Sequence, residues 1–124
     1  MNKANIGLLG GSFDPAHNGH LYISNKIINL LGLNQLWWLV TSKKPLKKKN
    51  QLFNINKRLS STYSINNNYK IKPQTLELTI GTNFTYDTIK KLNIIMPRVN
   101  FYWIMGADNL YTMHNWYNWK KIFY

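Results

Sequence analysis

The stretch Gly10–His20 (GGSFDPAHNGH) constrains the fold of this chain more than any other. Before it lies the short apolar run Ile6–Leu9, which is typical of a β-strand, and after it the apolar residues of Leu21–Leu31 recur at roughly helical spacing. We therefore expect the two glycines to end a strand and His20 to open a helix.

This strand–turn–helix context predicts a cradle for nucleotide phosphates. A glycine-rich turn lets backbone N–H groups approach a phosphate, and a helix N-terminus adds a partial positive charge. The imidazoles of His17 and His20 can donate hydrogen bonds to phosphate oxygens. The structural alternative is a turn punctuated by glycine and proline in which the histidines are incidental.

Size and composition narrow the class of protein. The chain has 124 residues, enough for one domain with one core, and it contains no cysteine. Disulfides, thiolate catalysis and a cysteine-based zinc site are therefore excluded. The sequence shows no apolar run of membrane-spanning length, and its polar start, Asn2–Asn5, is unlike a signal peptide, so we expect a cytoplasmic protein.

The net charge of +12, with only four acidic residues, suits phosphate-rich ligands or nucleic acid. The lysines are scattered, however, and the abundance of Asn, Ile, Lys and Tyr is what an AT-rich genome favours. We therefore give more weight to compositional drift than to a nucleic-acid partner. The four acidic residues become more informative, because in a chain with so few of them each one is a stronger candidate for a structural or functional role.

The chain alternates strands with helices, which predicts βαβ units and a mostly parallel sheet, an α/β fold. The expected strands are Asn5–Leu9, Leu36–Val40, two pieces of Tyr69–Ile80 separated at Pro73, and Val99–Ile104. The expected helices are Gly19–Leu31, closed by Gly32, then Asn54–Ile65, Thr85–Leu92, Asp108–Met113 and Trp116–Ile122. Leu36–Val40 is apolar throughout, as in strands that are buried on both faces.

A basic loop follows the second expected strand. Residues 41–49 contain five lysines, which could bind a triphosphate as point charges, although a solvated loop is as good an explanation for any single lysine. Arg58, on the next helix, could face a phosphate or solvent, and we expect solvent. Ligands of such folds bind beyond the carboxyl ends of the strands, where this loop is expected.

Two further stretches are expected at the same edge. In Gly81–Thr88, Asn83 or Thr85 can cap a helix, and Asp87 favours its positive end. The same free N–H groups could instead hold a small anion such as a carboxylate. After the last expected strand, Asp108 can accept hydrogen bonds from ribose hydroxyls or serve as an N-cap. Trp116 can stack on a planar heterocycle or belong to the core.

With these stretches together, the chain resembles bacterial nicotinate-nucleotide adenylyltransferases. Gly10–His20 matches the nucleotidylyltransferase superfamily pattern Gly-Gly-[Ser/Thr]-Phe-Asp-Pro-x-His-x-Gly-His. Asn83–Thr88 matches the narrower family pattern Ser-Tyr-Thr-x-Asp-Thr, with Asn-Phe in place of Ser-Tyr. Ile104–Leu110, with Trp116 after it, matches the family's Gly-x-Asp-x-Leu followed by a Trp.

The resemblance implies a Rossmann-like, three-layer α/β/α fold and a reaction in NAD biosynthesis. In that reaction ATP and nicotinate mononucleotide give deamido-NAD and pyrophosphate, with Mg²⁺ held mainly by the ATP phosphates and no metal ligand from the protein. The implied catalytic residues are His17 and His20. The implied ATP-binding residues are Gly10, Gly11, Ser12, Phe13, His17, His20, Lys47 (or Lys48), Gly106 and Asp108. The implied nicotinate mononucleotide-binding residues are Thr85, Trp116 and Tyr117.

One departure from the family concerns the end of the sequence. Family members continue past the Trp with another strand and an Ile-Ser-Ser-[Ser/Thr]-x-[Ile/Leu]-Arg motif that grips the ATP phosphates, whereas this sequence stops at Lys120–Tyr124. We therefore expect residues 1–124 to form one domain that lacks the family's last strand and helices. We expect it to keep its nucleotide-binding residues, to turn over far more slowly, and to be a monomer or a homodimer.

Two other functions compete with this one. A phosphopantetheine adenylyltransferase shares the first motif, and the acceptor that supports pyrophosphate release would distinguish it. A non-catalytic, basic nucleotide- or RNA-binding remnant would bind RNA in a salt-dependent way and gain no stability from ATP.

Overall fold

The computed structural model describes residues 3–11, 13, 15–40, 49–75 and 85–105. In this part of the chain, strands alternate with helices. The elements are β1 (Ala4–Gly11), α1 (Asn18–Leu31), β2 (Gln35–Val40), α2 (Lys49–Ile65), β3 (Ile71–Gln74), α4 (Thr85–Ile95) and β4 (Val99–Ile104). The strands form one sheet in the order β3-β2-β1-β4, and all neighbouring pairs are parallel.

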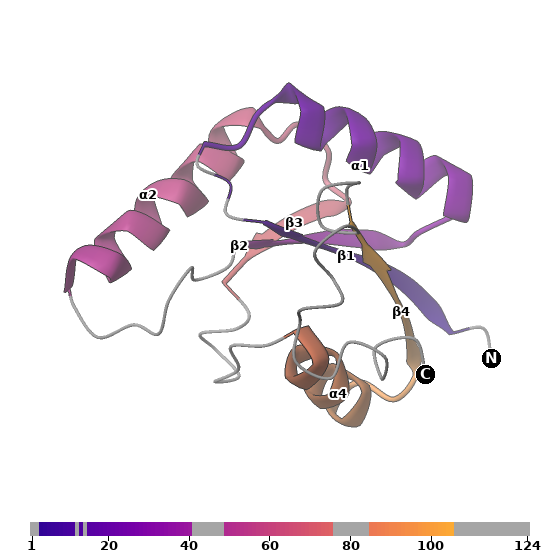
Figure 1. Cartoon of the computed structure of the whole chain (residues 1–124). Helices are drawn as coiled ribbons and strands as arrows, with labels where there is room; N and C mark the ends of the chain where they lie inside the picture. Colours follow the sequence, from indigo (N-terminus) through magenta and orange to yellow (C-terminus); the bar gives the residue numbers. More distant parts are fainter. Residues whose placement is uncertain (1–2, 12, 14, 41–48, 76–84, 106–124) are drawn as a thin grey trace.

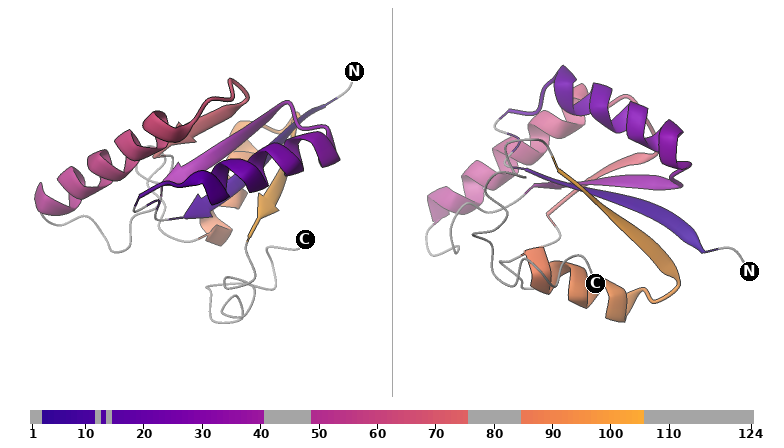
Figure 2. Two further views of the ribbon diagram at one scale, coloured as in Figure 1. Left: turned by 90° about the horizontal axis from the view of Figure 1, so that it is seen from above. Right: turned by 45° about the vertical axis from the view of Figure 1, so that its right-hand side comes forward.

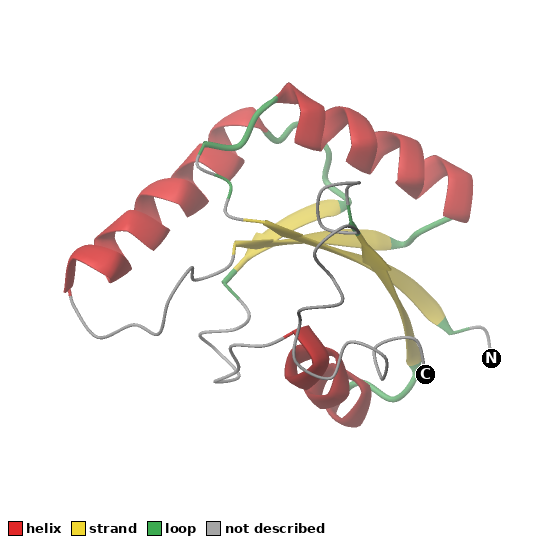
Figure 3. Ribbon diagram, viewed as in Figure 1, coloured by secondary structure: helices red, strands yellow, loops and turns green. Residues whose placement is uncertain are grey.

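The sheet lies between two layers of helices. Helices α1 and α2 cover one face and α4 covers the other, as the ribbon views show (Figure 1, Figure 3). This arrangement is a Rossmann-like, three-layer α/β/α fold, and it confirms the predicted fold class.

The direction of the chain across the sheet reverses once. It runs from β1 to β2 to β3 and then returns to β4 on the far side of β1, so that right-handed crossovers place α4 on the opposite face (Figure 2). Gly11 is in register with Val40, and Leu9 is in register with Ile104, so β1, β2 and β4 all end at one edge. The strand order reverses between the paired strands β1 and β4. The carboxyl ends of these two strands therefore form the switch point, beyond which such folds bind ligands.

Strand β2 is buried on both faces, as its apolar sequence predicted. Leu36, Trp38 and Val40 belong to the core cluster on the α1/α2 side. Trp37 and Leu39 alternate with them and belong to the second cluster, on the α4 side. The two clusters share one strand, so the position of β2 is fixed from above and below.

Two glycines shape the frame around the sheet. Gly32 ends α1 in the left-handed conformation, with φ of 62°, and its N–H donates to the carbonyl of Ile28, as expected for a helix C-cap. At Gly7 a Cβ atom would lie 2.8 Å from a methyl of Leu33 and 2.9 Å from a methyl of Ile104. Strand β1 therefore needs a residue without a side chain where it passes between them.

Several element boundaries differ from the prediction. Helix α2 begins at Lys49 and not at Asn54, because the segment after Pro45 holds no further glycine or proline that would end a helix. Pro73 lies within β3, opposite Trp38, and does not interrupt it. That is possible because β3 is the outermost strand of the described sheet, where a missing N–H breaks no ladder.

Arg58 also differs from the prediction, because its side chain is 4 % exposed and does not face solvent. Helix α4 extends to Ile95, one turn beyond the predicted Leu92. The expected helices at 108–113 and 116–122 and the expected strand up to Ile80 lie outside the described residues. Among the described helices, none combines the length and the hydropathy needed to cross a bilayer.

Candidate functional site

The turn between β1 and α1 presents both histidines at a helix N-terminus. Strand β1 ends at Gly11, as predicted, and α1 begins at Asn18 with His17 as its N-cap. The sequence predicted that His20 opens the helix, which was wrong by two residues, because α1 begins at Asn18 and His20 is its third residue. His17 takes the capping role because its extended backbone, with φ of −143°, is the conformation that N-caps adopt.

The two imidazoles form a reciprocal capping box. Nδ1 of His17 accepts a hydrogen bond from the Gly19 N–H at 3.1 Å, and Nδ1 of His20 accepts one from the His17 N–H at 3.1 Å. This is the pattern of a Ser-x-x-Glu capping box, with imidazole nitrogens in place of oxygens. Because both Nδ1 atoms accept, the neutral form of each ring carries its proton on Nε2. Both histidines therefore offer an Nε2–H donor, a suitable partner for a phosphate oxygen.

Aromatic rings stack behind the histidines. The ring centroids of His17 and His20 are 4.0 Å apart, and those of His20 and Phe13 are 4.6 Å apart. Phe13 in turn stacks on Trp38 of β2, with centroids 5.4 Å apart and an interplanar angle of 28°. The row of four rings connects the buried core to the helix N-terminus and restricts the tilt of His20.

This environment keeps His20 neutral. Burial lowers the pKa of His20 below the usual 6.5, and the proximity of His17 lowers it further. At neutral pH His20 can therefore donate a hydrogen bond without carrying a full charge.

Glycines make room for these rings. A Cβ atom at Gly19 would lie 2.8 Å from Cε1 and 2.9 Å from Nδ1 of His17, so only glycine leaves the His17 ring in place. At Gly11 a Cβ atom would lie 3.3 Å from the ring of Phe13. Phe13 itself has a φ of +49°, which is uncommon for a residue with a side chain, yet its side chain is only 2 % exposed. Packing holds this turn in a conformation that costs about 1 kcal/mol or more.

Three supporting residues were not found from the sequence. The buried hydroxyl of Ser24 accepts the indole N–H of Trp38 at 2.8 Å and fixes the ring that supports Phe13. The hydroxyl of Ser61, on α2, accepts the backbone N–H of Ala16 at 3.0 Å. Nothing in the local pattern distinguishes either serine from a solvent-facing one, because both act on segments distant in the sequence. Trp38 was recognised only as part of an apolar strand.

The structure brings together part of the predicted site. Gly10, Gly11, Phe13, His17 and His20 all lie between the end of β1 and the first turn of α1. Thr85 is the first residue of α4, the helix that covers the other face of the sheet (Figure 1). Asp87 is in the first turn of α4, where a negative charge favours the helix N-terminus, as predicted. The remaining predicted site residues lie outside the described residues: Ser12, Lys47, Gly106, Asp108, Trp116 and Tyr117.

The described side chains do not form a metal site. In that part of the chain there is no group of three or more His, Cys, Asp or Glu residues placed to hold a metal ion. The Nε2 atoms of His17 and His20 are protonated in the neutral rings, and their Nδ1 atoms accept backbone N–H groups. These rings are therefore built to donate hydrogen bonds and not to coordinate metal.

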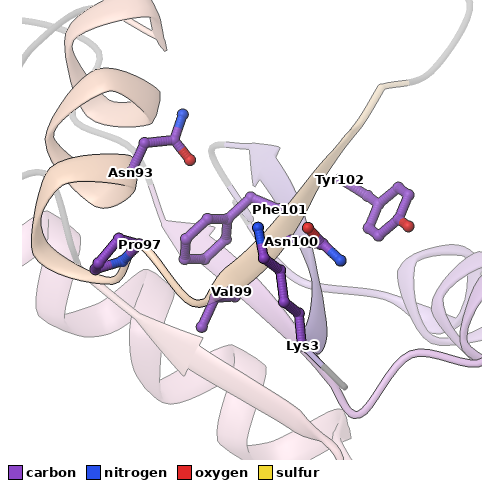
Figure 4. Close-up of a pocket in the computed structure, with 7 residues that line it drawn as sticks. All are labelled: Lys3, Asn93, Pro97, Val99, Asn100, Phe101 and Tyr102. Atoms are coloured by element: carbon purple, nitrogen blue, oxygen red, sulfur yellow. The ribbon is translucent and has the colours of Figure 1, made fainter. Parts of the chain in front are cut away.

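A hollow of about 590 Å³ lies at the opposite end of the sheet, near the start of β4 (Figure 4). Its lining comes from Lys3, the end of α4 and the first residues of β4: Asn93, Pro97, Val99, Asn100, Phe101 and Tyr102. Its polar side chains include one charged group, that of Lys3, and the amides of Asn93 and Asn100. It has no histidine, carboxylate or glycine-rich turn, so the chemistry of the chain is better placed at the histidine edge.

Comparisons with known proteins show which proteins the chain is similar to. A "Probable nicotinate-nucleotide adenylyltransferase" of Rhizobium johnstonii is 43% identical over 94% of this chain and 59% of its own length. One of Parvibaculum lavamentivorans is 39% identical over 94% of this chain and 58% of its own length. The chain thus spans about three fifths of the length of these curated relatives.

A solved structure shares the fold. The Plasmodium falciparum nicotinic acid mononucleotide adenylyltransferase, solved in complex with NaAD, superposes with a TM-score of 0.77 at 24% identity. The superposition covers 96% of this chain and 60% of the other. The cytidylyltransferase-like family model matches residues 8–124, which include the whole turn with both histidines, and the chain therefore belongs to the cytidylyltransferase-like family.

Proposed function

We propose that this chain carries a site for adenylyl transfer from ATP to nicotinate mononucleotide, which gives deamido-NAD and pyrophosphate. The observation that carries the proposal is the pair of imidazoles whose Nδ1 atoms are both occupied by backbone N–H groups. Their Nε2–H groups are the donors available to a ligand at a helix N-terminus, beside the switch point of the sheet. The names of the curated relatives support the choice of acceptor.

The proposed reaction needs no nucleophile from the protein. A phosphate oxygen of nicotinate mononucleotide attacks the α-phosphorus of ATP in line, the bond from the α-phosphorus to the bridging oxygen breaks, and pyrophosphate leaves. Catalysis then rests on positioning and on stabilising the charge that develops on the phosphate oxygens. His17 and His20 perform the second task as Nε2–H donors to those oxygens.

The residues outside the described part complete the proposal. We place Lys47 (or Lys48), Gly106 and Asp108 on the ATP side and Trp116 and Tyr117 on the pyridine side. We place Thr85, whose backbone lies in the N-terminal turn of α4, against the nicotinate carboxylate. Backbone N–H groups aimed at a carboxylate favour nicotinate over the neutral nicotinamide.

Mg²⁺ is the cofactor of this proposal. It would be held by the ATP phosphates and by water, because the described part of the chain has no group of three or more His, Cys, Asp or Glu residues placed to hold a metal ion. It would neutralise phosphate charge. We place the protein in the cytoplasm, where ATP is supplied.

The test is pyrophosphate release from ATP, measured with the full chain and each acceptor in turn. We expect release that depends on nicotinate mononucleotide and is lower with nicotinamide mononucleotide or phosphopantetheine. A His20→Ala variant should lose about 100-fold, as when one charge-stabilising donor is removed. Because the chain spans about three fifths of its relatives, acceptor dependence and not the absolute rate is decisive. Release supported equally by phosphopantetheine, or salt-sensitive RNA binding with no release, would contradict the proposal.

A further inference from the structure

The hydroxyl of Ser61 connects α2 to the turn that precedes the histidines. Its oxygen accepts the backbone N–H of Ala16 at 3.0 Å. The hydroxyl can donate its proton to either of two carbonyl oxygens. That of Arg58, one turn earlier in α2, lies 2.6 Å from the Ser61 Oγ, and that of Phe13 lies 3.4 Å from it. One serine thus accepts from one end of the Phe13–Ala16 turn and lies within hydrogen-bond range of the other.

The turn that Ser61 contacts is the one that needs support. Phe13 has a φ of +49°, and the side chains of Phe13 and Ala16 are both buried. A strained backbone persists only when its surroundings determine it more than once. The packing of the Phe13 ring on Trp38 is one such restraint, and the Ser61 hydroxyl is a second one from a different element.

A shift of this turn would reach both imidazoles. Ala16 is followed directly by His17, whose backbone N–H donates to Nδ1 of His20. The ring of Phe13 packs against the ring of His20, at a centroid distance of 4.6 Å and an interplanar angle of 38°. Ser61 therefore touches the residue before the first histidine and the residue that packs against the second.

We propose that Ser61 is a positioning residue, which fixes the Phe13–Ala16 turn and thereby the Nε2–H groups of His17 and His20 for phosphate. This inference rests on the proposed function, because it assumes that those donors meet ATP. Ser61 does not touch the ligand. It acts through the backbone of the turn.

The chain offers a matched control in Ser64. It lies one turn later in α2, is exposed, and donates to the carbonyl of Ser60 at 3.2 Å. Ser64→Ala therefore makes the same chemical change on the same helix, without a partner in the turn. Ser61→Thr provides a rescue, because a threonine hydroxyl in a helix can still bond the carbonyl one turn earlier.

The experiment combines two readouts on the full-length chain. Histidine ring ¹⁵N shifts and the Ala16 amide shift are recorded without ligand, and ATP is then titrated by calorimetry. In Ser61→Ala we expect the Ala16 and histidine signals to move and ATP affinity to fall about tenfold. In Ser61→Thr we expect most of the affinity to return, and Ser64→Ala should behave as the wild type.

The outcomes separate this inference from the proposed function. Wild-type protein that binds ATP, together with a Ser61→Ala variant that binds it equally well or loses no more than Ser64→Ala, overturns the positioning role alone. Wild-type protein without affinity for ATP overturns the proposed function, whether or not the histidine signals respond to Ser61. A loss of affinity in Ser61→Ala with unchanged histidine signals would also overturn the inference, because the effect would then not pass through the turn.

Discussion

At the scale of single residues, the site depends on how the proton of each imidazole is placed. Nδ1 of His17 and Nδ1 of His20 both accept backbone N–H groups of their own helix turn. An aspartate cap would satisfy the same backbone N–H groups, but an ionised carboxylate only accepts hydrogen bonds and would present no donor outward. Histidine at these two positions caps the helix and also offers an Nε2–H to a ligand.

Gly19 tests whether the ring of His17 must lie where it does. In Gly19→Ala the new Cβ would meet the imidazole at 2.8 Å, so the ring must move and its bond to the Gly19 N–H must weaken. Alanine favours a helix over glycine by about 1 kcal/mol, so lost helix propensity cannot explain a defect. We expect a calorimetric ATP affinity lowered about tenfold, with at most a small change in the urea midpoint. Unchanged affinity would show that the His17 ring position is irrelevant.

His20 gives the protein a pH dependence of defined sign. Its pKa is lowered in the folded state by burial and by His17, so the unfolded chain binds its proton more tightly. The stabilisation is complete above the ordinary pKa of 6.5 and is lost as the pH falls below that value towards the lower pKa of the folded state.

The comparison uses His20→Gln, since glutamine at this helix position can keep the reciprocal cap. We expect the urea midpoint of the wild type to fall between about pH 7.5 and about pH 5.5 by more than that of His20→Gln. Equal falls in the two proteins would mean that His20 does not titrate between the two states.

At the scale of elements, the link between α1 and β2 positions the row of rings. The indole N–H of Trp38 donates to Ser24, and both residues are fully buried. Ser24→Ala leaves that N–H without its acceptor, which costs about 1–3 kcal/mol of unfolding free energy. The exposed Ser64→Ala is the control, and we expect it to change the free energy from urea unfolding by less than about 0.5 kcal/mol. Similar losses in both variants would show that the Ser24–Trp38 bond does not stabilise the fold.

Most of the helices and strands could be predicted from the sequence, because those that carry the site have clear hydrophobic patterns. The all-apolar run over β2 predicts a strand buried on both faces, and Gly32 predicts the end of α1. Pro73 wrongly predicts a break in the strand, because β3 can contain a proline only as an outermost strand of the described sheet, and the sequence does not show that position. The roles of Ser24 and Ser61 could not be predicted, since each depends on a partner in another element.

At the scale of the whole molecule, the order of the strands decides where the site lies. Strand β1 stands between β2 and β4, so its carboxyl end is next to the switch point, where we propose that the motif that follows it meets a bound ligand. The Gly10–His20 pattern predicted this position, and the family match over residues 8–124 includes that pattern. The pyridine side of the predicted site rests largely on residues 106–124, outside the described residues, and stays a prediction.

The most direct test of the account is a calorimetric titration of ATP into the full chain and two histidine variants. His17→Asn keeps an N-cap acceptor, and His20→Gln can keep the reciprocal cap, but each changes the Nε2–H donor. We predict that wild type binds ATP and that each variant, still folded, binds it about tenfold or more weakly, as expected for the loss of a hydrogen bond to a charged group. ATP binding that is equal in all three proteins would contradict the central claim that these two imidazoles hold the nucleotide phosphates.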